Sequence, residues 1–223
     1  MTARDTVLAA IRAALADVPG DEPAKTVPRD YPRSHADADP VGVFAERVAE
    51  YRATVGRTAD PATEIAGALA RRDVRRPVVL TGFPVEWLAP EAPWTVLRDS
   101  PRLSVEALDN ADAVLSTVAV AIAVTGTLVL DAGPGQGRRA LTLLPDYQLC
   151  VVRAGQIARD VPEALDRLDP TAPLTFVSGP SATSDIELDR VEGVHGPRTL
   201  DVVIVDAGKQ AKSRSARTSA ASG

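Results

Sequence analysis

Apolar positions recur at helical spacing three times in the first 72 residues. Between residues 2 and 18 the predicted apolar stripe consists of Val7, Leu8, Ile11, Leu15 and Val18, with Thr2 as the cap. Asp39-Pro40 and Asp60-Pro61 each begin a further helix, because proline is favoured at the first helical position. We expect the helix that begins at Pro40 to run to about Val55, and the helix that begins at Pro61 to run to about Arg72. The buried stripe of the helix from Pro40 is predicted to consist of Val43, Phe44, Val48, Tyr51 and Val55.

From residue 77 the pattern changes to short runs of Val, Leu and Ile, which predict strands at 77–81, 94–97, 149–152, 174–177 and 200–205. The apolar stretch 112–131 is too long for one strand and has no helical stripe. We predict two strands there, or a strand and a tight crossover, broken at Thr125-Gly126 and returning along Leu128 to Leu130. Residues 157–168 are expected to be helical, and 185–191 to form a short helix or turn.

This alternation predicts an α/β fold with a mostly parallel sheet flanked by helices. Residues 1–39 are expected to form an N-terminal helical extension with an irregular, proline-rich connection, and 40–206 the α/β domain. Residues 207–223 have no apolar period and are expected to form a disordered tail. The first helix is expected to pack outside the main core or on a neighbouring subunit, so a homo-oligomer is one of the states considered.

Composition narrows the class of protein. Lys and Arg number 25 and Asp and Glu 30, a net charge of -5 that argues against a nucleic-acid partner. Cys150 is the single cysteine, so this chain alone can build neither a disulfide nor a cysteine-ligated iron–sulfur or zinc site. His35 and His195 are too far apart in sequence for metal-ligand spacing, and no metal site is expected. No apolar run is long enough to span a bilayer and no signal region is evident, which predicts a cytoplasmic protein without a membrane span.

Four polar, glycine-marked segments border the apolar runs, and in α/β proteins ligands bind where loops meet strand ends. The segments span 125–127, 133–139, 178–185 and 193–197. The candidate ligand-binding residues in them are Thr125, Gly126, Thr127, Gly135, Gly137, Arg138, Arg139, Gly179, Ser181, Thr183, Ser184, Asp185 and His195.

Each segment has a functional and a purely structural interpretation. The glycines before Arg138 and Arg139 resemble a phosphate-binding turn, although their spacing fits neither the dinucleotide fingerprint nor the P-loop; a surface turn is the alternative. Ser184 and Glu187 fit a helix capping box, which is compatible with other hydroxyls lining a site. His195 is the candidate catalytic residue, as a general base or orienting donor, or else it fixes a turn.

Read together and in order, these segments resemble the LUD domain family over residues 109–206. The matching text includes Ala121 to Leu130, Gly137 to Pro145, Ser178 to Glu187, and Gly193 to Arg198. The resemblance extends to the members that serve bacterial lactate utilisation, and it implies a fold shared with sugar-phosphate isomerases and CoA transferases. It also implies a role in oxidising L-lactate to pyruvate beside partner proteins that hold the iron–sulfur clusters, with no cofactor in this chain.

Two positions depart from the family pattern. Val124 stands where relatives usually have Glu or Asp, and Gln148 where they often have His. A lost carboxylate removes a potential acid, base or nucleophile. The four matched segments predict an accessory component of a lactate-oxidising system, with a small anionic ligand in the loop cluster, and Val124 counts against an enzyme. The alternatives are a free-standing enzyme of the acyl or CoA transferase or sugar-phosphate isomerase type, and a ligand-sensing module.

Overall fold

The computed structural model describes residues 2–18, 39–183 and 191–206, and the chain divides into two units, Met1–Pro32 and Arg33–Gly223. The first unit contains helix α1 (Ala3–Ala14), whose start is capped by Thr2 and Asp5 as a reciprocal pair. This confirms the first helix. Its apolar stripe is exposed, with Val7 and Ile11 at 58% and 48% of full accessibility.

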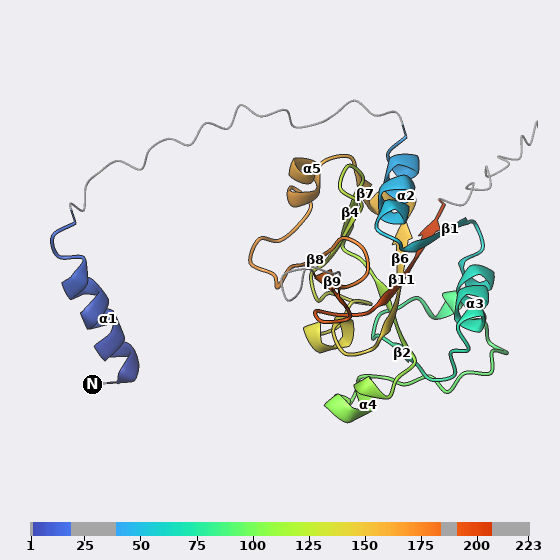
Figure 1. The fold of residues 1–223 in the computed structure, drawn as a ribbon, viewed down its shortest axis with the longest axis horizontal. Helices are drawn as coiled ribbons and strands as arrows, with labels where there is room; N and C mark the ends of the chain where they lie inside the picture. The colour runs from blue at the N-terminus through green and yellow to red at the C-terminus, as the bar shows by residue number, and fades with distance from the viewer. Residues whose placement is uncertain (1, 19–38, 184–190, 207–223) are drawn as a thin grey trace, which may run out of the picture. The chain divides into compact units, whose positions relative to one another are not determined.

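The second unit is built on a parallel sheet of five strands (Figure 1). In spatial order these are β1 (Thr54–Thr58), β11 (Thr199–Val205), β6 (Tyr147–Arg153), β3 (Ala113–Thr117) and β2 (Pro77–Val79). The central pair, β11 and β6, is in register from Thr199 opposite Tyr147 to Val205 opposite Arg153. The parallel sheet confirms the α/β class, and the strands expected at 77–81, 149–152 and 200–205 are confirmed.

Two helices cover opposite faces of this sheet, α2 (Pro40–Glu50) and α3 (Pro61–Arg71) (Figure 1). Both start as predicted: Asp39 and Asp60 accept hydrogen bonds from the amides of Gly42 and Thr63. The prediction that the first of them reaches Val55 is wrong. Arg52 adopts φ +69°, which ends the helix, and Val55 instead pairs with Val202 as part of the edge strand β1.

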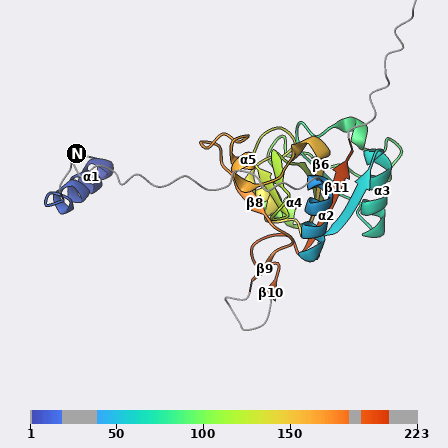
Figure 2. The same ribbon diagram turned by 90° about the horizontal axis from the view of Figure 1, so that it is seen from above.

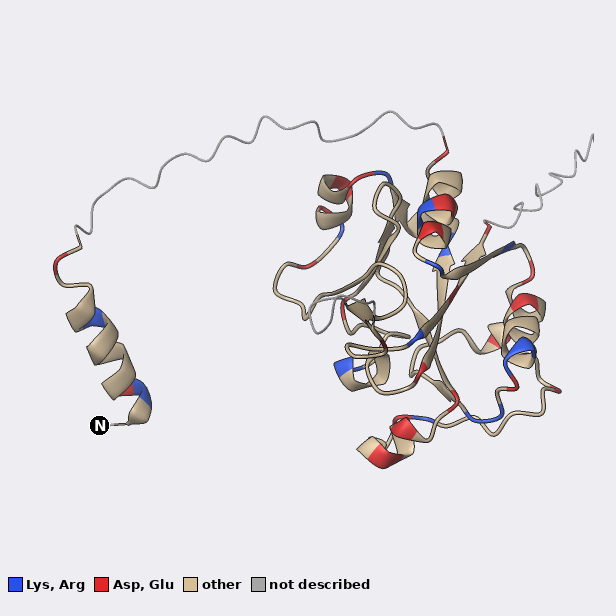
Figure 3. Cartoon of the chain, viewed as in Figure 1, with Lys and Arg blue, Asp and Glu red and all other residues tan. Residues whose placement is uncertain are grey.

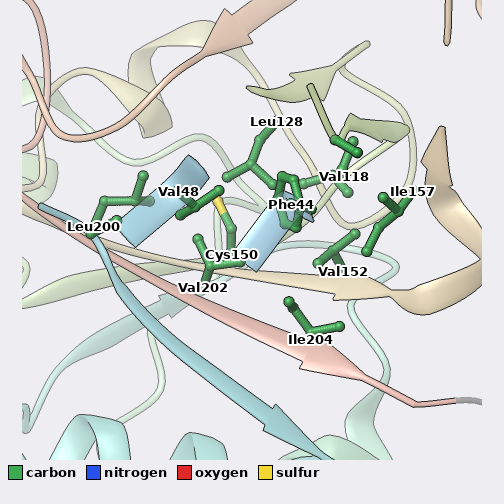
Figure 4. Packing of buried hydrophobic residues seen from close by; sticks show 13 residues of the cluster. Phe44, Val48, Val118, Leu128, Cys150, Val152, Ile157, Leu200, Val202 and Ile204 are labelled. Carbon is green, nitrogen blue, oxygen red and sulfur yellow. The ribbon is translucent and has the colours of Figure 1, made fainter. Parts of the chain in front are cut away.

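Strand alternation assigns residues of β6 to the two faces. Cys150 and Val152 join Phe44 and Val48 of α2, together with Val202 and Ile204, in a fully buried cluster (Figure 4). Leu149 and Val151 pack on the other face with Ile65 and Leu69 of α3. The low aromatic content leaves these clusters mainly aliphatic. Cys150 is fully buried in the cluster beside α2, and burial raises the pKa of its thiol to about 12.

A second sheet of four strands packs beside the first. Its order is β7 (Ile157–Ala158), β4 (Val120–Ile122), β5 (Thr127–Leu130) and β8 (Thr175–Val177). The stretch 112–131 thus forms three strands, because the chain leaves the first sheet after Thr117 and enters the second at Val120. The predicted break at Thr125-Gly126 and the return strand are confirmed, and the break after Thr117 was missed. The strand at 174–177 is confirmed as β8, antiparallel to β5.

Two further predictions are wrong. Residues 94–97 do not form a strand, since Leu97 makes a single parallel bridge with Val78. Residues 157–168 are not one helix: Ile157 and Ala158 pair with β4, and helix α5 begins only at Val161. Pro162 sits in the first turn of α5 and favours this later start.

The remaining elements are short. They are η1 (Val85–Trp87), α4 (Val105–Asp109), η2 (Arg139–Thr142), η3 (Ala154–Gln156) and the antiparallel pair β9 (Ala182–Thr183) and β10 (Val191–Glu192). The β9–β10 pair projects from the body of the unit (Figure 2). The short helix or turn expected at 185–191 lies outside the described residues, except for Val191 in β10.

The strands of the central sheet bear few charges, and acidic and basic segments are interspersed over the helices and loops (Figure 3). Several of these charges pair locally, as Arg57 with Asp206 at 2.8 Å. Among the helices of the described residues, none has the length and apolar character needed to cross a bilayer.

Candidate functional site

Two adjoining pockets of about 260 and 500 Å³ flank strand β8. They share Arg139, Thr142 and Phe176, and we refer to them together as the β8 groove. The smaller, polar compartment is lined by Arg139, Thr142, Gln148, the segments 176–182 and 195–197, and Leu200. The larger, more apolar compartment is lined by Leu130, Ala132, the segments 136–139 and 173–176, and Thr142.

The polar compartment lies over the amino ends of β6 and β11. Gln148 and Leu200 are the second residues of these strands and lie at its base, and Pro197 precedes β11. Ligands of open parallel sheets usually bind at the opposite, carboxyl edge. The glycine-rich segment does reach that edge, since the Gly135 amide donates to Thr81 after β2 and its carbonyl accepts from Thr117. The four glycine-marked segments therefore do not converge on one edge of the sheet.

Arg138 and Arg139 have different environments. Arg138 donates from Nε to Asp99 Oδ2 at 2.8 Å and from Nη2 to both Asp99 Oδ1 and the Leu103 carbonyl. These hydrogen bonds are the main cause that lowers the pKa of Asp99. Arg139 is exposed and, within the described part of the chain, its guanidinium has no hydrogen bond or ion pair. Of the two arginines, Arg138 is the one that is paired among the described residues.

His195 is positioned by its backbone. Its amide donates to Ser181 Oγ at 3.0 Å, and the Ser181 amide donates to the Pro197 carbonyl. These bonds join the segment before β9 to the segment before β11 and place His195 at the wall of the polar compartment. Its ring makes no hydrogen bond with any described residue, so it is open to a ligand or to solvent.

The glycine-rich turn uses its amides internally. Gly133 donates to Asp131 Oδ1, Gly135 to the Thr81 carbonyl and Gln136 to the Gly133 carbonyl. The positive φ of Gly135 brings its backbone against Thr117, where a Cβ would lie 2.5 Å from Oγ1. This close packing against β3 explains the glycine without a ligand. Gly137, at the next positive φ, lines the larger compartment.

The Thr125-Gly126-Thr127 turn joins β4 to β5 and packs on α2, where a Cβ on Gly126 would lie 2.8 Å from that of Arg47. Its hydroxyls form a chain: Thr125 to Thr127 at 2.7 Å, and Thr127 to Ser178 at 2.8 Å. Ser178 lines the groove, while the threonines lie behind it. The turn therefore supports the groove wall through Ser178.

The two departures from the family pattern lie in different places. Val124 packs with the cluster around Val120 and Ile122, away from both compartments. Gln148 is 1% exposed at the base of the polar compartment, and its Nε2 donates to Ser116 Oγ at 3.2 Å. Gln148 is thus the departure that bears on the groove.

The lining of the groove is cationic and hydroxylic. Arg138, Arg139 and His195 line it, and no Asp or Glu does so among the described residues. Within the same residues no cluster of three or more His, Cys, Asp or Glu could hold a metal. An arginine without a partner and several hydroxyls favour an anion, because a guanidinium binds carboxylate or phosphate in a bidentate manner.

Six of the candidate residues predicted from the sequence line the groove: Gly137, Arg138, Arg139, Gly179, Ser181 and His195. Thr125, Gly126, Thr127, Gly135 and Thr183 line neither compartment. Ser184, Asp185 and His35 lie outside the described residues. Thr142 and Phe176 were missed because no local motif marks either of them: Thr142 is the last residue of the short 3₁₀ helix η2, and Phe176 has the pattern of an ordinary strand residue.

The protein has an α/β fold and an arginine-lined groove, whose polar compartment lies over the amino ends of β6 and β11. The model of the LUD domain matches residues 100–205, which include every residue that lines the groove. The chain is 44% identical over 194 residues to "Lactate utilization protein C" of Deinococcus radiodurans, covering 84% of this chain and 90% of that one. The chain belongs to the LUD domain family.

Two further comparisons agree with this assignment. "Lactate utilization protein C" of Shouchella clausii is 34% identical over 116 residues, 49% of this chain and 50% of the relative. The crystal structure of a DUF162 family protein from Deinococcus radiodurans is similar with a TM-score of 0.64 and 40% sequence identity. That match covers 78% of this chain and 99% of the solved chain.

Proposed function

We propose that this protein is an accessory component, itself without an iron–sulfur cluster, of a bacterial L-lactate utilisation system that converts L-lactate to pyruvate. The observation that supports the proposal is the 44% identity, over 84% of the chain, to a protein named for lactate utilisation. With a single, buried cysteine, the chain cannot supply cysteine ligands for a cluster. In this proposal the clusters belong to partner proteins, and the chain acts in the cytoplasm.

The second part of the proposal is that the β8 groove binds a small anion. The Arg139 guanidinium has no partner among the described residues, so an anion gains a hydrogen-bonded ion pair without displacing any of them. The His195 ring and the hydroxyls of Ser178 and Ser181 line the same compartment. The absence of a carboxylate among the described lining residues avoids repulsion.

The lining also favours one alternative. A groove that attracts an anion but offers no carboxylate base among its described residues suits a ligand sensor, whose output would be a change in partner binding. In a transferase or isomerase, a base or nucleophile would have to face the ligand, and His195 is the candidate for that role.

The test is growth of the native bacterium on L-lactate. Deleting the gene should abolish or strongly slow growth on L-lactate while leaving growth on pyruvate unchanged, and a plasmid copy should restore it. Unchanged growth on L-lactate would contradict the lactate role.

A second experiment tests the partners. The tagged chain, purified from cells grown on L-lactate, should bring down iron-containing proteins and L-lactate oxidation, with neither in the chain purified alone. A clean, iron-free preparation without partners would contradict complex formation. A ligand sensor would differ from a constitutive subunit by releasing or recruiting these partners when L-lactate or pyruvate is added.

A further inference from the structure

Phe176 differs from the other two phenylalanines of the chain. Phe44 and Phe83 are 0% and 4% exposed, while Phe176 is 50% exposed and lines both compartments of the β8 groove. Its neighbour Val177 packs against the core cluster, so alternation along β8 turns Phe176 away from that cluster. A phenylalanine in a concave site that remains half exposed presents an aromatic surface to a ligand.

The larger compartment continues this apolar surface. Leu130, Pro173 and Leu174 line it beside Phe176, and Arg139 and Thr142 stand at its junction with the polar compartment. A ligand can therefore place an anionic group at Arg139 and extend an apolar body over Phe176.

The volume of the groove also favours a ligand with an anionic part and an apolar part. A three-carbon acid such as L-lactate would occupy only part of the polar compartment of about 260 Å³ and leave the adjoining compartment of about 500 Å³ empty. Sites for ligands of drug or cofactor size measure about 300–1,000 Å³. Both compartments together fit a ligand with two parts.

We propose that the β8 groove binds a phosphate joined to a flat ring, as in a nucleoside monophosphate. The phosphate contacts Arg139, and the ring stacks on Phe176 in the apolar compartment. This inference rests on the anion binding of the proposed function and adds the second part of the ligand. Stacking on an aromatic side chain tolerates any flat ring, so the ring type is set by the fit of the compartment rather than by base-edge hydrogen bonds.

The experiment is calorimetric titration of the full chain with AMP, ribose 5-phosphate and inorganic phosphate. AMP is expected to bind about fivefold or more tightly than ribose 5-phosphate, since stacking of one base on an aromatic side chain provides at least about that factor. Phe176→Ala should remove this advantage and leave ribose 5-phosphate binding unchanged, and Phe176→Leu separates stacking from apolar contact. Arg139→Gln should weaken both ligands about tenfold or more.

Arg98→Gln is the matched control, because Arg98 is exposed, makes no side-chain hydrogen bond or ion pair with described residues and lines neither compartment. All four variants should unfold at the same urea concentration as the parent chain, since each replaces an exposed side chain.

The outcomes separate this inference from the proposed function. If phosphate and ribose 5-phosphate bind through Arg139 but AMP binds no more tightly, the two-part ligand is refuted and the anion site stands. An AMP advantage that survives Phe176→Ala also refutes it. If none of the three ligands binds, both the anion site and this inference fail, while growth on L-lactate still tests the accessory role.

Discussion

The amino ends of β6 and β11 carry a closed polar cluster on one face of the central sheet and an open groove on the other. Tyr147 and Gln148 are neighbours at the start of β6 and point to opposite faces. On the Tyr147 side, the phenol donates to Asp201 Oδ2 at 2.9 Å, and Arg72 donates to the same carboxylate at 2.7 and 3.2 Å. On the Gln148 side, Arg139 and His195 have no side-chain partner among the described residues.

The comparison distinguishes an arginine that is paired within the protein from one that has no partner among the described residues. Arg72 lies with its guanidinium 4.8 Å from the centroid of the Tyr147 ring and is also paired with Asp201. Burial and the neighbouring Asp201 carboxylate raise the pKa of Tyr147, so the phenol stays protonated and donates its hydrogen bond. Every member of this cluster is satisfied within the chain. In the β8 groove, by contrast, the Arg139 guanidinium and the His195 ring have no partner among the described residues.

Breaking the closed cluster should have the largest effect on stability. Asp201→Asn keeps the shape of the side chain but removes the charge that holds Arg72 and Tyr147. We expect a loss of about 2–4 kcal/mol in the free energy of unfolding, below the upper range for buried pairs because Arg72 is partly exposed. Urea unfolding at neutral pH measures this loss.

Asp206→Asn is the control, because its pair with Arg57 is of similar length but more exposed. It should cost less than about 1 kcal/mol. Equal losses for the two variants would contradict the distinction between the closed cluster and an ordinary surface pair.

The next largest effect should come from Asp99, which holds Arg138 at the rim of the groove. Asp99→Asn should cost about 2 kcal/mol, since it removes charge-assisted hydrogen bonds in a mostly buried pair. The pKa of Asp99 in the folded state lies below its ordinary 3.8. Its stabilising contribution is therefore complete above about pH 5 and is lost as the pH falls through and below 3.8.

Unfolding measured between pH 7 and pH 3 tests that dependence. The difference in stability between the parent chain and Asp99→Asn should shrink as the pH falls. A difference that stays constant or grows toward pH 3 would show that the Asp99 carboxylate does not stabilise the fold through Arg138.

Substitution of Gly179 tests whether this residue of the groove wall is required by packing. It adopts φ +88°, and a Cβ there would lie 2.5 Å from that of Tyr51. Gly179→Ala should therefore cost about 1–3 kcal/mol. Gly155→Ala should change stability by less than about 0.5 kcal/mol, since nothing lies within 4 Å of its added Cβ. If the two variants are equally stable, Gly179 is not required by packing.

The smallest effect on stability is expected for Arg139. Arg139→Gln should change the free energy of unfolding by less than about 0.5 kcal/mol, because the side chain is exposed and unpaired among described residues. A large loss of stability would show that Arg139 supports the fold and would remove the contrast with Arg72.

The fold class could be predicted because its signals are local. Asp39 and Asp60, each followed by a proline, cap α2 and α3 through contacts within three residues of the chain, and continuous Val and Leu runs are typical of parallel strands buried on both faces. The transfer of the chain from one sheet to the other after Thr117 could not be predicted, since Val118 and Ala119 continue the apolar run from β3 into β4 without a glycine or proline. It depends on tertiary pairing of Val120 with Val129.

The candidate site was predicted in part for a similar reason. Glycine and polar motifs marked Arg139 and His195, but they also marked Gly135 and Thr125, whose hydrogen bonds and packing are internal. Phe176 has no local signal, because its exposure depends on β8 being an edge strand beside an open compartment. The positions of the loops could be predicted from the sequence. Which charged side chains in them are already paired depends on contacts between segments that are distant in the sequence.

The most direct test of the central claim is growth on L-lactate of the deletion strain carrying the gene for Arg139→Gln, with protein levels matched to the parent. Arg98→Gln serves as the control. We predict that the parent chain and Arg98→Gln restore growth, and that Arg139→Gln restores it poorly despite normal folding. Full restoration by Arg139→Gln would contradict the claim that the β8 groove is the functional site of this protein.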